Sequence, residues 1–396
     1  MRSRCWCYDY NSGIYRFNGE SVIKEETQKW LDMLGMSSEA SSHFVNEVIG
    51  YIKRATCVNR EQLNADFDIV VVKNGVLDLN TGKVYEHSKD YKATIAIPVA
   101  YDAVAECPRI DQFVREVVEQ KDISLLYEVP AWCLTPYSGI QRLVILLGEG
   151  ANGKTVYLEV IRRFLGRNNC TVYSLQSLTT NRFAIAGLYD KLANISPELP
   201  SNALKQAGPL KTLTGLDTIE AEKKFKDSFN FVNTAKMIFA SNAPPEINED
   251  TLAVWRRFVT VDFPFTFKGD RADKNLLAKL TTEQELSGLL NKALDGLIRL
   301  KRNGDFTYTT SIEDTRAKYL LASNPASAFI EDHCEFSAWG NITKEELYQA
   351  FMKFCEDNKL PGMAKKAFGR KIKRAYNLSE ERESWRGINL KEETQR

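Results

Sequence analysis

The stretch LVILLGEGANGKTVYLEVIRRFLG, residues 143–166, constrains the fold of this chain more than any other part of the sequence. A short apolar run typical of a buried strand leads into a glycine-rich turn, and an amphipathic segment of helical periodicity follows. The turn fits the pattern G-x-x-x-x-G-K-[ST] at Gly148, Gly153, Lys154 and Thr155. A strand, such a turn and a helix in this order predict an α/β fold with a phosphate-binding loop.

The chemistry of the turn predicts the cofactors. Glycines allow main-chain N–H groups to surround a phosphate, and the N-terminus of the following helix favours negative charge. Lys154 would contact the β- and γ-phosphates of ATP and Thr155 would hold Mg²⁺. A chance glycine turn would match the pattern in roughly one or two per cent of chains of this length. The predicted nucleotide-binding residues are Gly148, Gly150, Ala151, Asn152, Gly153, Lys154, Thr155 and Val156.

Composition limits the remaining function classes. The formal net charge of +1 excludes a uniformly basic surface, so any contact with nucleic acid must use local basic patches. The eight cysteines and three histidines lack zinc-ligand spacing and predict reduced thiols. No run approaches the about 20 apolar residues of a membrane helix, and no secretory signal opens the chain. We therefore expect a cytoplasmic protein, in a host cell or in a bacterial or archaeal cytosol, with no membrane partner.

The order of apolar patterns predicts the domain organisation. Alternating strand-like and helical runs around the glycine-rich turn predict helices on both faces of a mainly parallel sheet. The strand candidates are LVILL, KLANIS, KMIFASN and FVTVDFPF. At 396 residues there is room for several cores. We expect an N-terminal α+β domain at 1–107, the ATPase domain at 108–269, a helical segment at 270–325 and a helix-rich tail at 326–396.

Smaller elements are also predicted within these domains. A helical piece is expected around residues 25–54, and the apolar and turn pattern of IVVVKNGVLDLNTGKVYEH predicts an antiparallel meander. A helical stretch is expected from about 108 to 135. The stretch SWRGINL near the C-terminus has the pattern of a strand.

Polar residues follow two of the strand candidates. Glu198, in KLANISPELP, is a candidate base for positioning water and a second candidate metal contact beside Thr155. Pro197 precedes it, where many such NTPases carry another acid, so Glu198 would act alone. Asn242, in KMIFASNAPP, could touch the γ-phosphate or orient water. A solvent-facing glutamate and a turn asparagine are the alternative interpretations.

Arg256 and Arg257 stand directly before the last strand candidate. An arginine in that position could complete the phosphate site of a neighbouring subunit by stabilising charge in the transition state. For a lone Arg-Arg pair considered without its context, a surface ion pair is the favoured alternative.

The order of these motifs resembles that of the superfamily 3 helicases, in the branch formed by primase-helicases of phages, plasmids and large DNA viruses. The stretches GEGANGKT, KLANISPEL, LKTLTGLDTIEAEKKFKDSF, KMIFASNAPP and VWRRFVTVDFPF carry the resemblance. The stretch NGVLDLNTGKVYEH is similar to the domain that precedes the motor, and the tail is similar to a winged-helix end. The resemblance implies an AAA+ P-loop NTPase core.

The resemblance also implies a function. It predicts an ATP-dependent replicative DNA helicase of a mobile genetic element, a hexameric ring that translocates on single-stranded DNA and opens forked DNA together with a primase. Lys154 and Thr155 would contact phosphate and Mg²⁺, Glu198 would be the catalytic acid and Asn242 the polar sensor. The arginine finger would be Arg256 or Arg257, between which spacing does not choose.

Two basic stretches are candidates for DNA contact. The resemblance makes Lys223, Lys224 and Lys226, which surround Phe225, part of a DNA-gripping hairpin, and cations around an aromatic suit phosphate contact with base stacking. In KKAFGRKIKRAYN a helix would turn Phe368, Ile372 and Tyr376 inward. Solvated charged surfaces are the alternative for both stretches. The cations predicted to face a phosphate backbone in the second stretch are Lys366, Arg370, Lys373 and Arg374.

Two other functions remain open from the sequence. A P-loop kinase acting on a small molecule would use the same glycine-rich turn but would not need the arginine pair. A replication initiator or loader that uses ATP only to hold its ring together is favoured by Pro197. No acidic catalytic cluster of a primase precedes Tyr101, so a primase would be a separate protein or part of a longer chain.

Overall fold

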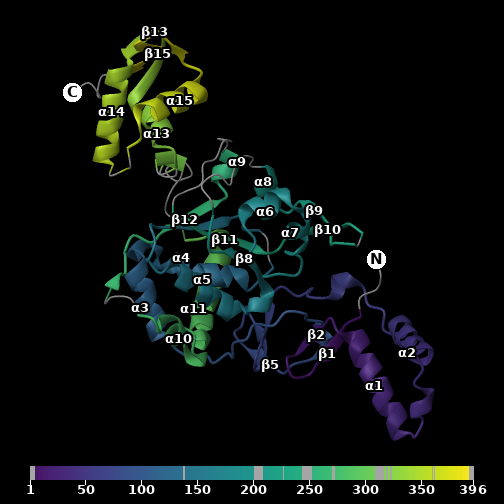
Figure 1. Ribbon diagram of the computed structural model, residues 1–396. Helices are drawn as coiled ribbons and strands as arrows, with labels where there is room; N and C mark the ends of the chain where they lie inside the picture. The colour runs from purple at the N-terminus through teal and green to yellow at the C-terminus, as the bar shows by residue number, and fades with distance from the viewer. Residues whose placement is uncertain are drawn as a thin grey trace.

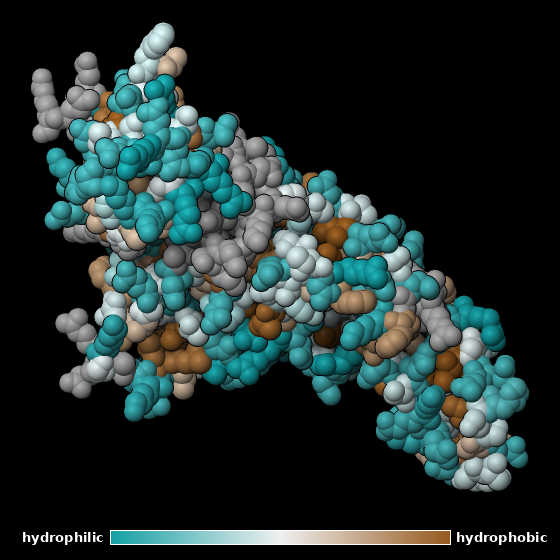
Figure 2. Space-filling view, turned by 45° about the horizontal axis from the view of Figure 1, so that its top comes forward, coloured by the Kyte–Doolittle hydropathy of each residue, from teal (hydrophilic) through white to brown (hydrophobic). Residues whose placement is uncertain are grey.

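The computed structural model describes residues 5–136, 139–199, 208–225, 227–242, 252–269, 273–307, 316–317, 320–321, 323–358, 360 and 362–391. A central α/β body lies between two N-terminal helices and a C-terminal unit, and this gives the molecule an elongated shape (Figures 1 and 2). Hydrophilic residues cover most of the face seen in Figure 2, and the hydrophobic ones lie in separate small patches.

The central sheet has the strand order β12-β6-β11-β8-β7 among the described residues, and all its pairings are parallel. The chain leaves β6 for the β7 edge, returns through β8 and β11, and adds β12 on the other side of β6. The four predicted strand candidates are confirmed, and β7 was not predicted. The bounds are β6 (Leu143–Leu147), β7 (Cys170–Thr171), β8 (Ala193–Ser196), β11 (Lys236–Ser241) and β12 (Phe258–Asp262).

Helices cover both faces of this sheet, as predicted. Successive residues of β6 enter different cores, with Val144 and Leu146 on one face and Leu143 and Ile145 on the other. Such a strand is buried on both sides, which explains its continuous apolar sequence. The α/β fold class is therefore confirmed.

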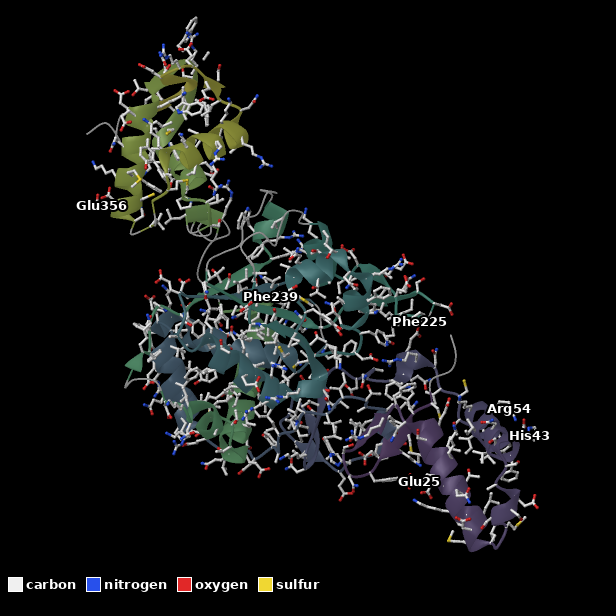
Figure 3. The ribbon with its side chains drawn as sticks, in the orientation of Figure 1. Glu25, His43, Arg54, Phe225, Phe239 and Glu356 are labelled. Atoms are coloured by element: carbon white, nitrogen blue, oxygen red, sulfur yellow. The ribbon has the colours of Figure 1, made fainter. Side chains whose placement is uncertain are left out.

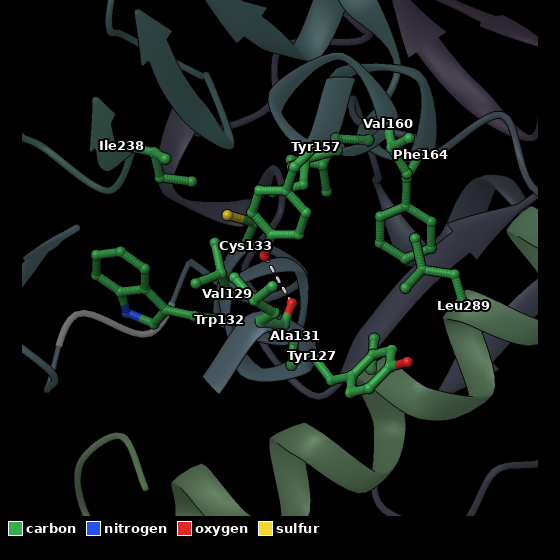
Figure 4. Close-up of a cluster of buried hydrophobic side chains, with 14 of the residues drawn as sticks. Tyr127, Val129, Ala131, Trp132, Cys133, Tyr157, Val160, Phe164, Ile238 and Leu289 are labelled. Carbon is green, nitrogen blue, oxygen red and sulfur yellow. Dashed lines mark hydrogen bonds between the residues drawn. The ribbon is translucent and has the colours of Figure 1, made fainter. Parts of the chain in front are cut away.

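The first face is covered by helices that bury large side chains together. Figure 4 shows part of this core, where Tyr157 lies near Cys133 and its hydroxyl donates to the Leu126 carbonyl oxygen at 2.6 Å. The predicted helical stretch at 108–135 forms two helices separated by the 3-10 turn η4 (Gln120–Asp122). The helices on this face are α3 (Pro108–Val117), α4 (Ile123–Cys133), α5 (Lys154–Leu165), α10 (Leu276–Leu280) and α11 (Glu283–Asn303).

The second face is covered by short helices and a separate hairpin. The hairpin is formed by β9 (Thr218–Ala221) and β10 (Phe229–Val232), which pair with each other and not with the central sheet. The helices are α6 (Leu175–Thr180), α7 (Arg182–Ala186), α8 (Gly208–Thr214) and α9 (Leu252–Trp255). The short turn η5 (Arg167–Asn169) lies between α5 and β7.

The N-terminal region begins with the strands β1 (Cys7–Asp9) and β2 (Ile14–Arg16). The helical piece predicted around 25–54 is two helices, α1 (Gly19–Met33) and α2 (Ser42–Ala55), because Ser41 caps a new helix by accepting from the Phe44 amide at 3.2 Å. The predicted meander is confirmed as antiparallel pairing of β3 (Ile69–Val72), β4 (Gly75–Asp78) and β5 (Val84–Tyr85). Three 3-10 turns complete the region: η1 (Ser37–Glu39), η2 (Arg60–Gln62) and η3 (Lys89–Tyr91).

One large core joins the meander to the central α/β body. Val70 and Leu77 from the meander belong to the same buried cluster as Phe113 of α3 and Leu289 of α11. The segments predicted as 1–107, 108–269 and 270–325 therefore pack against one another through shared apolar side chains.

The C-terminal unit has a core of its own, built around Phe329, Phe351 and Phe368. Its antiparallel sheet has the order β13-β15-β14, and SWRGINL is confirmed as a strand. The long first strand was not predicted. The elements are α13 (Pro325–His333), β13 (Cys334–Thr343), α14 (Lys344–Asp357), α15 (Lys365–Tyr376), β14 (Ser379–Glu380) and β15 (Ser384–Leu390).

Within the described ranges, no helix combines the length and the apolar character needed to cross a bilayer. All eight cysteines are free thiols. Among the residues that the structure describes, no three His, Cys, Asp or Glu side chains gather as a metal site would require.

Candidate functional site

The glycine-rich turn lies at the carboxyl end of β6, directly before α5. The order of strands in the chain reverses at β6, with β11 on one side and β12 on the other. In open parallel sheets, ligands bind outside the carboxyl ends of the strands at such a reversal. The predicted phosphate loop therefore lies where this fold binds ligands.

Two glycines of the loop cannot be replaced without rearrangement. A Cβ at Gly148 would lie 2.0 Å from Asn152 Nδ2 and 2.6 Å from the Phe263 carbonyl oxygen. Gly153 has φ +89°, and a Cβ there would lie 2.8 Å from Val117 Cγ1. Both positions require glycine, because the loop backbone packs directly against the chain that follows β12 and against α3.

Residues after β12 also brace the loop. The Phe267 amide donates to the Ala151 carbonyl oxygen at 2.7 Å, and Asn152 Nδ2 donates to the Phe263 carbonyl oxygen at 3.3 Å. Asn152 is buried and so acts inside the loop. The loop is therefore preformed by contacts within the protein.

Lys154 is buried at the first position of α5. Its ammonium donates to the Gly148 carbonyl oxygen and, at 3.1 Å, to Asn152 Oδ1. Burial lowers the pKa of Lys154 because these two partners are neutral. An anion in the loop would supply the missing negative charge.

Thr155, the next residue, is exposed at the N-terminus of α5. The first-turn N–H groups of a helix have no acceptor within the helix, and they carry partial positive charge. The start of α5 can therefore bind phosphate through its backbone while the Thr155 hydroxyl stays accessible to a metal ion.

Strand register brings Glu198 and Asn242 to the same edge of the sheet. Ser241, at the end of β11, pairs with Leu147 at the end of β6, and Asn242 follows it. Ser196 pairs with Phe239, so Glu198 lies two residues further on, level with Ser241. Glu198 and Asn242 are both exposed. Adjacent strands are about 4.8 Å apart, which separates the end of β6 from that of β8 by roughly 10 Å.

Two serines that sequence reasoning missed hold the chain beyond these strands. Ser196 Oγ donates to the Glu198 carbonyl oxygen at 3.1 Å, and Ser241 Oγ donates to the Leu199 carbonyl oxygen at 2.9 Å. Their signal was a hydroxyl at the last position of each of two neighbouring strands. These bonds fix the backbone that carries Glu198.

The two arginines lie at the opposite edge of the sheet. Phe258, which follows them, pairs with Leu143 at the amino end of β6. Arg257 is 7% exposed, and its Nε donates to Thr214 Oγ1 at 3.0 Å. Arg256 is exposed, and its backbone carbonyl oxygen accepts from Arg142. The structure therefore does not bring either arginine to the phosphate loop of its own chain.

The hairpin between the second and third motifs presents its tip to solvent. Phe225 is fully exposed, and Figure 3 shows it at the outer end of the hairpin, whereas Phe239 lies inside the central body. Lys224 is exposed, and Lys223 lies over the Phe229 ring at 5.7 Å. Lys226 lies outside the described residues.

The basic stretch of the tail forms α15, as predicted. Phe368 and Ile372 are buried in the core of the C-terminal unit, and Tyr376 is partly buried against it. The predicted cations Lys366, Arg370, Lys373 and Arg374 are exposed. Lys373 forms an ion pair with Glu380 at 2.7 Å, which lowers its availability to another anion.

Three protein-family models match this chain over separate ranges. Residues 1–119 match "D5 N terminal like", residues 146–257 match "Family of unknown function (DUF5906)" and residues 322–395 match "Poxvirus D5 protein-like". The first and third ranges flank the candidate phosphate site, and the second contains it.

Two viral proteins are similar in sequence. "Putative helicase L207/L206" of Acanthamoeba polyphaga mimivirus is 24% identical over 221 residues, which cover 52% of this chain and 23% of that protein. "Putative helicase 184R" of Invertebrate iridescent virus 6 is 24% identical over 237 residues, which cover 54% of this chain and 24% of that protein. The matched part spans about a quarter of each relative. Together with the D5 matches, these relatives confirm the resemblance to D5-like viral helicases that the motif order predicts.

Solved structures of the NrS-1 C-terminal region also align with this chain. The apo structure of its residues 305–718 is 13% identical, covers 78% of this chain and 88% of that chain, and has a TM-score of 0.41. An A-form apo structure of the region is 14% identical, covers 81% and 85% of the two chains, and also has a TM-score of 0.41.

Proposed function

We propose that this chain contains the motor of an ATP-dependent replicative DNA helicase from a mobile genetic element, a virus, phage or plasmid. The observation that carries the proposal is the preformed glycine loop with buried Lys154 at the reversal point of a parallel sheet. The names of the two viral relatives and the D5 matches support it. The AAA+ fold and the winged-helix form of the tail are part of the same proposal.

ATP with Mg²⁺ fits the residues of the loop. The Lys154 ammonium has only neutral oxygen partners recorded in the described residues, so triphosphate oxygens would stabilise its charge. The loop backbone and the first turn of α5 would bind phosphate. Thr155, with Glu198 nearby at the same sheet edge, would hold Mg²⁺, which when bound neutralises charge on the β- and γ-phosphates.

The exposure and register of Glu198 and Asn242 support a role for both in hydrolysis. Glu198 would accept a proton from the attacking water. Asn242 follows β11, the strand between Glu198 and the loop, and would orient that water or the γ-phosphate. Both side chains are exposed at the carboxyl edge of the sheet and thus accessible to a bound nucleotide.

Arg256 is the residue we propose as the arginine finger. The Arg257 side chain donates a hydrogen bond to Thr214 within its own chain, whereas the Arg256 side chain is exposed. The five residues of β6 separate this edge from the loop by roughly 15 Å. Arg256 would therefore act on the nucleotide of a neighbouring subunit, as a closed ring requires, and a hexamer is the ring we propose.

The hairpin tip and α15 would provide the contacts to single-stranded and forked DNA. Lys223, Lys224 and Lys226 would meet phosphates in the ring channel while the exposed Phe225 stacks on a base. The exposed cations of α15 would contact a duplex backbone. The helicase would act in the cytoplasm of a host cell, or in a bacterial or archaeal cytosol, together with a primase on a separate or longer chain.

Pro197 favours a second candidate function. It is exposed after β8, where a second acid would strengthen metal binding. Without that acid the chain would be an initiator or loader that binds ATP and DNA but does not hydrolyse ATP.

Measurement of ATP hydrolysis with and without single-stranded DNA tests these proposals. The wild type is compared with Lys154→Ala, Glu198→Gln and Arg256→Ala, and oligomer size is recorded for each. The helicase proposal predicts DNA-stimulated turnover that all three variants lose while the Arg256→Ala oligomer persists. Binding without turnover would favour the initiator, and DNA-insensitive turnover by a monomer would overturn the helicase proposal.

A further inference from the structure

The β9–β10 hairpin depends on side-chain contacts at its base for its orientation. Its two strands pair only with each other among the described residues, and an isolated two-stranded hairpin is marginally stable in water. Ile219, Ala221 and Phe231 anchor its inner face in the core, while Phe225 at the tip is fully exposed. Whatever fixes the base therefore sets the direction of the tip.

Tyr189, in the turn before β8, contacts the aromatic rings of both Phe229 and Phe231 in β10. Its ring meets Phe229 edge-on at 5.2 Å and Phe231 edge-on at 5.4 Å between centroids. The Lys223 ammonium lies 6.0 Å from the Tyr189 ring and 5.7 Å from the Phe229 ring. Tyr189 thus contacts one strand of the hairpin and the residue that begins its basic tip.

Arg60, from the N-terminal region, contacts Tyr189 in two ways and also pairs with the adjacent Asp190. Its Nε donates to the Tyr189 hydroxyl at 3.0 Å, its guanidinium carbon lies 5.5 Å from the centre of the Tyr189 ring, and its Nη2 pairs with Asp190. Asp190 has φ +61°, a left-handed conformation that directs the turn so that adjacent residues both reach Arg60. Partial burial opposes the charge, but Asp190 and Tyr189 outweigh it and raise the pKa of Arg60.

The turn that carries Arg60 is itself bonded to the segment that follows the meander. It begins the turn η2, in which Gln62 Oε1 accepts from Lys92 Nζ at 2.8 Å. Asn64 then bonds Thr94 twice, as a donor to the hydroxyl at 2.6 Å and as an acceptor from the amide at 2.7 Å. Arg60 and Tyr189 are 129 positions apart in the sequence, and their contact links the N-terminal region to the hairpin through the Tyr189 ring.

We propose that Arg60 is a positioning residue that orients the β9–β10 hairpin through Tyr189 and so couples single-stranded DNA binding to ATP turnover. This inference rests on the proposed function, in which the hairpin contacts DNA. Arg60 touches neither nucleotide nor DNA in this proposal. Its loss would loosen the hairpin base and leave the phosphate loop intact.

The test compares Arg60→Ala with Arg54→Ala, a surface arginine on α2 of the same region (Figure 3). ATP turnover is measured against single-stranded DNA concentration. Arg60→Ala should raise the DNA concentration for half-maximal stimulation roughly three- to tenfold. DNA-free turnover should stay within about twofold, because Arg60 contacts the turn before the amino end of β8, whereas the phosphate loop follows the carboxyl end of β6. Arg54→Ala should change neither quantity.

Variants of the partners identify the contact responsible. Arg60→Lys keeps a charge for Asp190 but loses the fork that reaches both partners, so its defect should be intermediate. Tyr189→Phe keeps the ring and removes the hydroxyl acceptor. Its effect should be smaller in the Arg60→Ala background than in the wild type, as expected for residues acting through one contact.

Hydrogen exchange gives a readout that does not require DNA. Backbone amides of residues 218–221 and 229–232 should exchange faster in Arg60→Ala than in Arg54→Ala. The inference would be overturned if Arg60→Ala loses DNA-free and DNA-stimulated turnover equally, or if hydrogen exchange in its hairpin is unchanged. Neither result would contradict ATP hydrolysis that depends on Lys154. A wild type insensitive to DNA but with faster hairpin exchange in Arg60→Ala would instead overturn the proposed function and, with it, the coupling.

Discussion

Adjacent arginines have different surroundings in this protein, and the difference predicts separable phenotypes. Arg257 is buried and donates to Thr214, so Arg257→Ala should lower the free energy of unfolding by about 1–3 kcal/mol. Arg256 is exposed, and Arg256→Ala should leave stability within about 0.5 kcal/mol. If Arg256 is the arginine finger, Arg256→Ala should nevertheless lower ATP turnover about 10³-fold or more. Thermal unfolding and steady-state ATP hydrolysis measure the two effects.

If Arg257→Ala is stable but has lost ATP turnover while Arg256→Ala stays active, Arg257 and not Arg256 is the arginine finger. Glu149→Ala serves as the control, because it removes an exposed charge from the loop at a variable position of the motif pattern.

Lys236 predicts a pH dependence of stability. Burial lowers its pKa from 10.5 to about 8, and its ammonium lies 5.2 Å from the centre of the Trp132 ring. Below pH 8 both states carry the charge and the folded state bears the full cost of burying it. Between pH 8 and 10.5 the unfolded state binds more protons, so this contribution to stability rises with pH.

Urea unfolding of the wild type and Lys236→Met at pH 7 and pH 10 measures this effect. The free energy of unfolding of Lys236→Met minus that of the wild type should fall by about 2–3 kcal/mol between the two pH values. Lys279 is an exposed residue of α10. For Lys279→Met, the difference in free energy of unfolding from the wild type should hardly change between pH 7 and pH 10. A constant difference for Lys236→Met would mean that its pKa is not lowered.

At the scale of elements, helical glycines differ in what a side chain would meet. A Cβ at Gly288 of α11 would lie 2.3 Å from the backbone carbonyl carbon of Glu106. Gly288→Ala should therefore destabilise the protein by roughly 1–3 kcal/mol, because backbone atoms must move apart. At Gly50 of α2 the nearest atom is the flexible end of Arg54, at 3.2 Å. Gly50→Ala should stabilise by about 0.5–1 kcal/mol, since alanine favours the helix.

Thermal unfolding followed by circular dichroism compares these two glycine variants. Similar shifts of the midpoint in the same direction would show that α11 does not pack as closely against residue 106 as the structure describes.

Elements with a local signal were predictable from the sequence. The strand, glycine turn and helix around Lys154 occupy one continuous stretch, so their order along the chain is sufficient to predict them. The strand β13 lacked such a signal. Its register shifts between Phe336 and Asn341, and adjacent residues are exposed in two pairs, one of which contains Trp339. Without alternating burial, no period of two marks it as a strand.

Contacts between distant segments could not be predicted. No residue near Arg257 in the sequence indicates that Thr214 will accept its hydrogen bond. Sequence spacing therefore does not show which of the two arginines is the finger. The same holds for Arg60 and Tyr189, which belong to different predicted domains. The four serines Ser37, Ser38, Ser41 and Ser42 are a local signal of a helix break, which the prediction of one helical piece did not use.

At the scale of the whole molecule, a finger that acts between subunits predicts rescue by mixing. Lys154→Ala chains lack a working phosphate loop but keep Arg256, and Arg256→Ala chains keep the loop. In mixed rings at equal amounts, about a quarter of the interfaces would join a working loop to a working arginine. ATP hydrolysis by the mixture should exceed the sum of the separate variants.

The mixed sample must be refolded or diluted and reassembled, so that subunits exchange before turnover is measured. Activity no greater than the sum of the two variants, despite mixed oligomers seen with differently tagged chains, would contradict action between subunits.

The core that joins the meander to α11 has a consequence for biosynthesis. Leu77 leaves the ribosome long before Leu289, with which it shares that core. At about 5–20 residues per second, the roughly 200 intervening residues delay completion of the core by roughly 10–40 s. During that interval the nascent meander exposes an apolar face to the cell. The fraction of chains that reach the native state would then depend on chaperone binding at this stage more than on the stability of the contacts in the folded core.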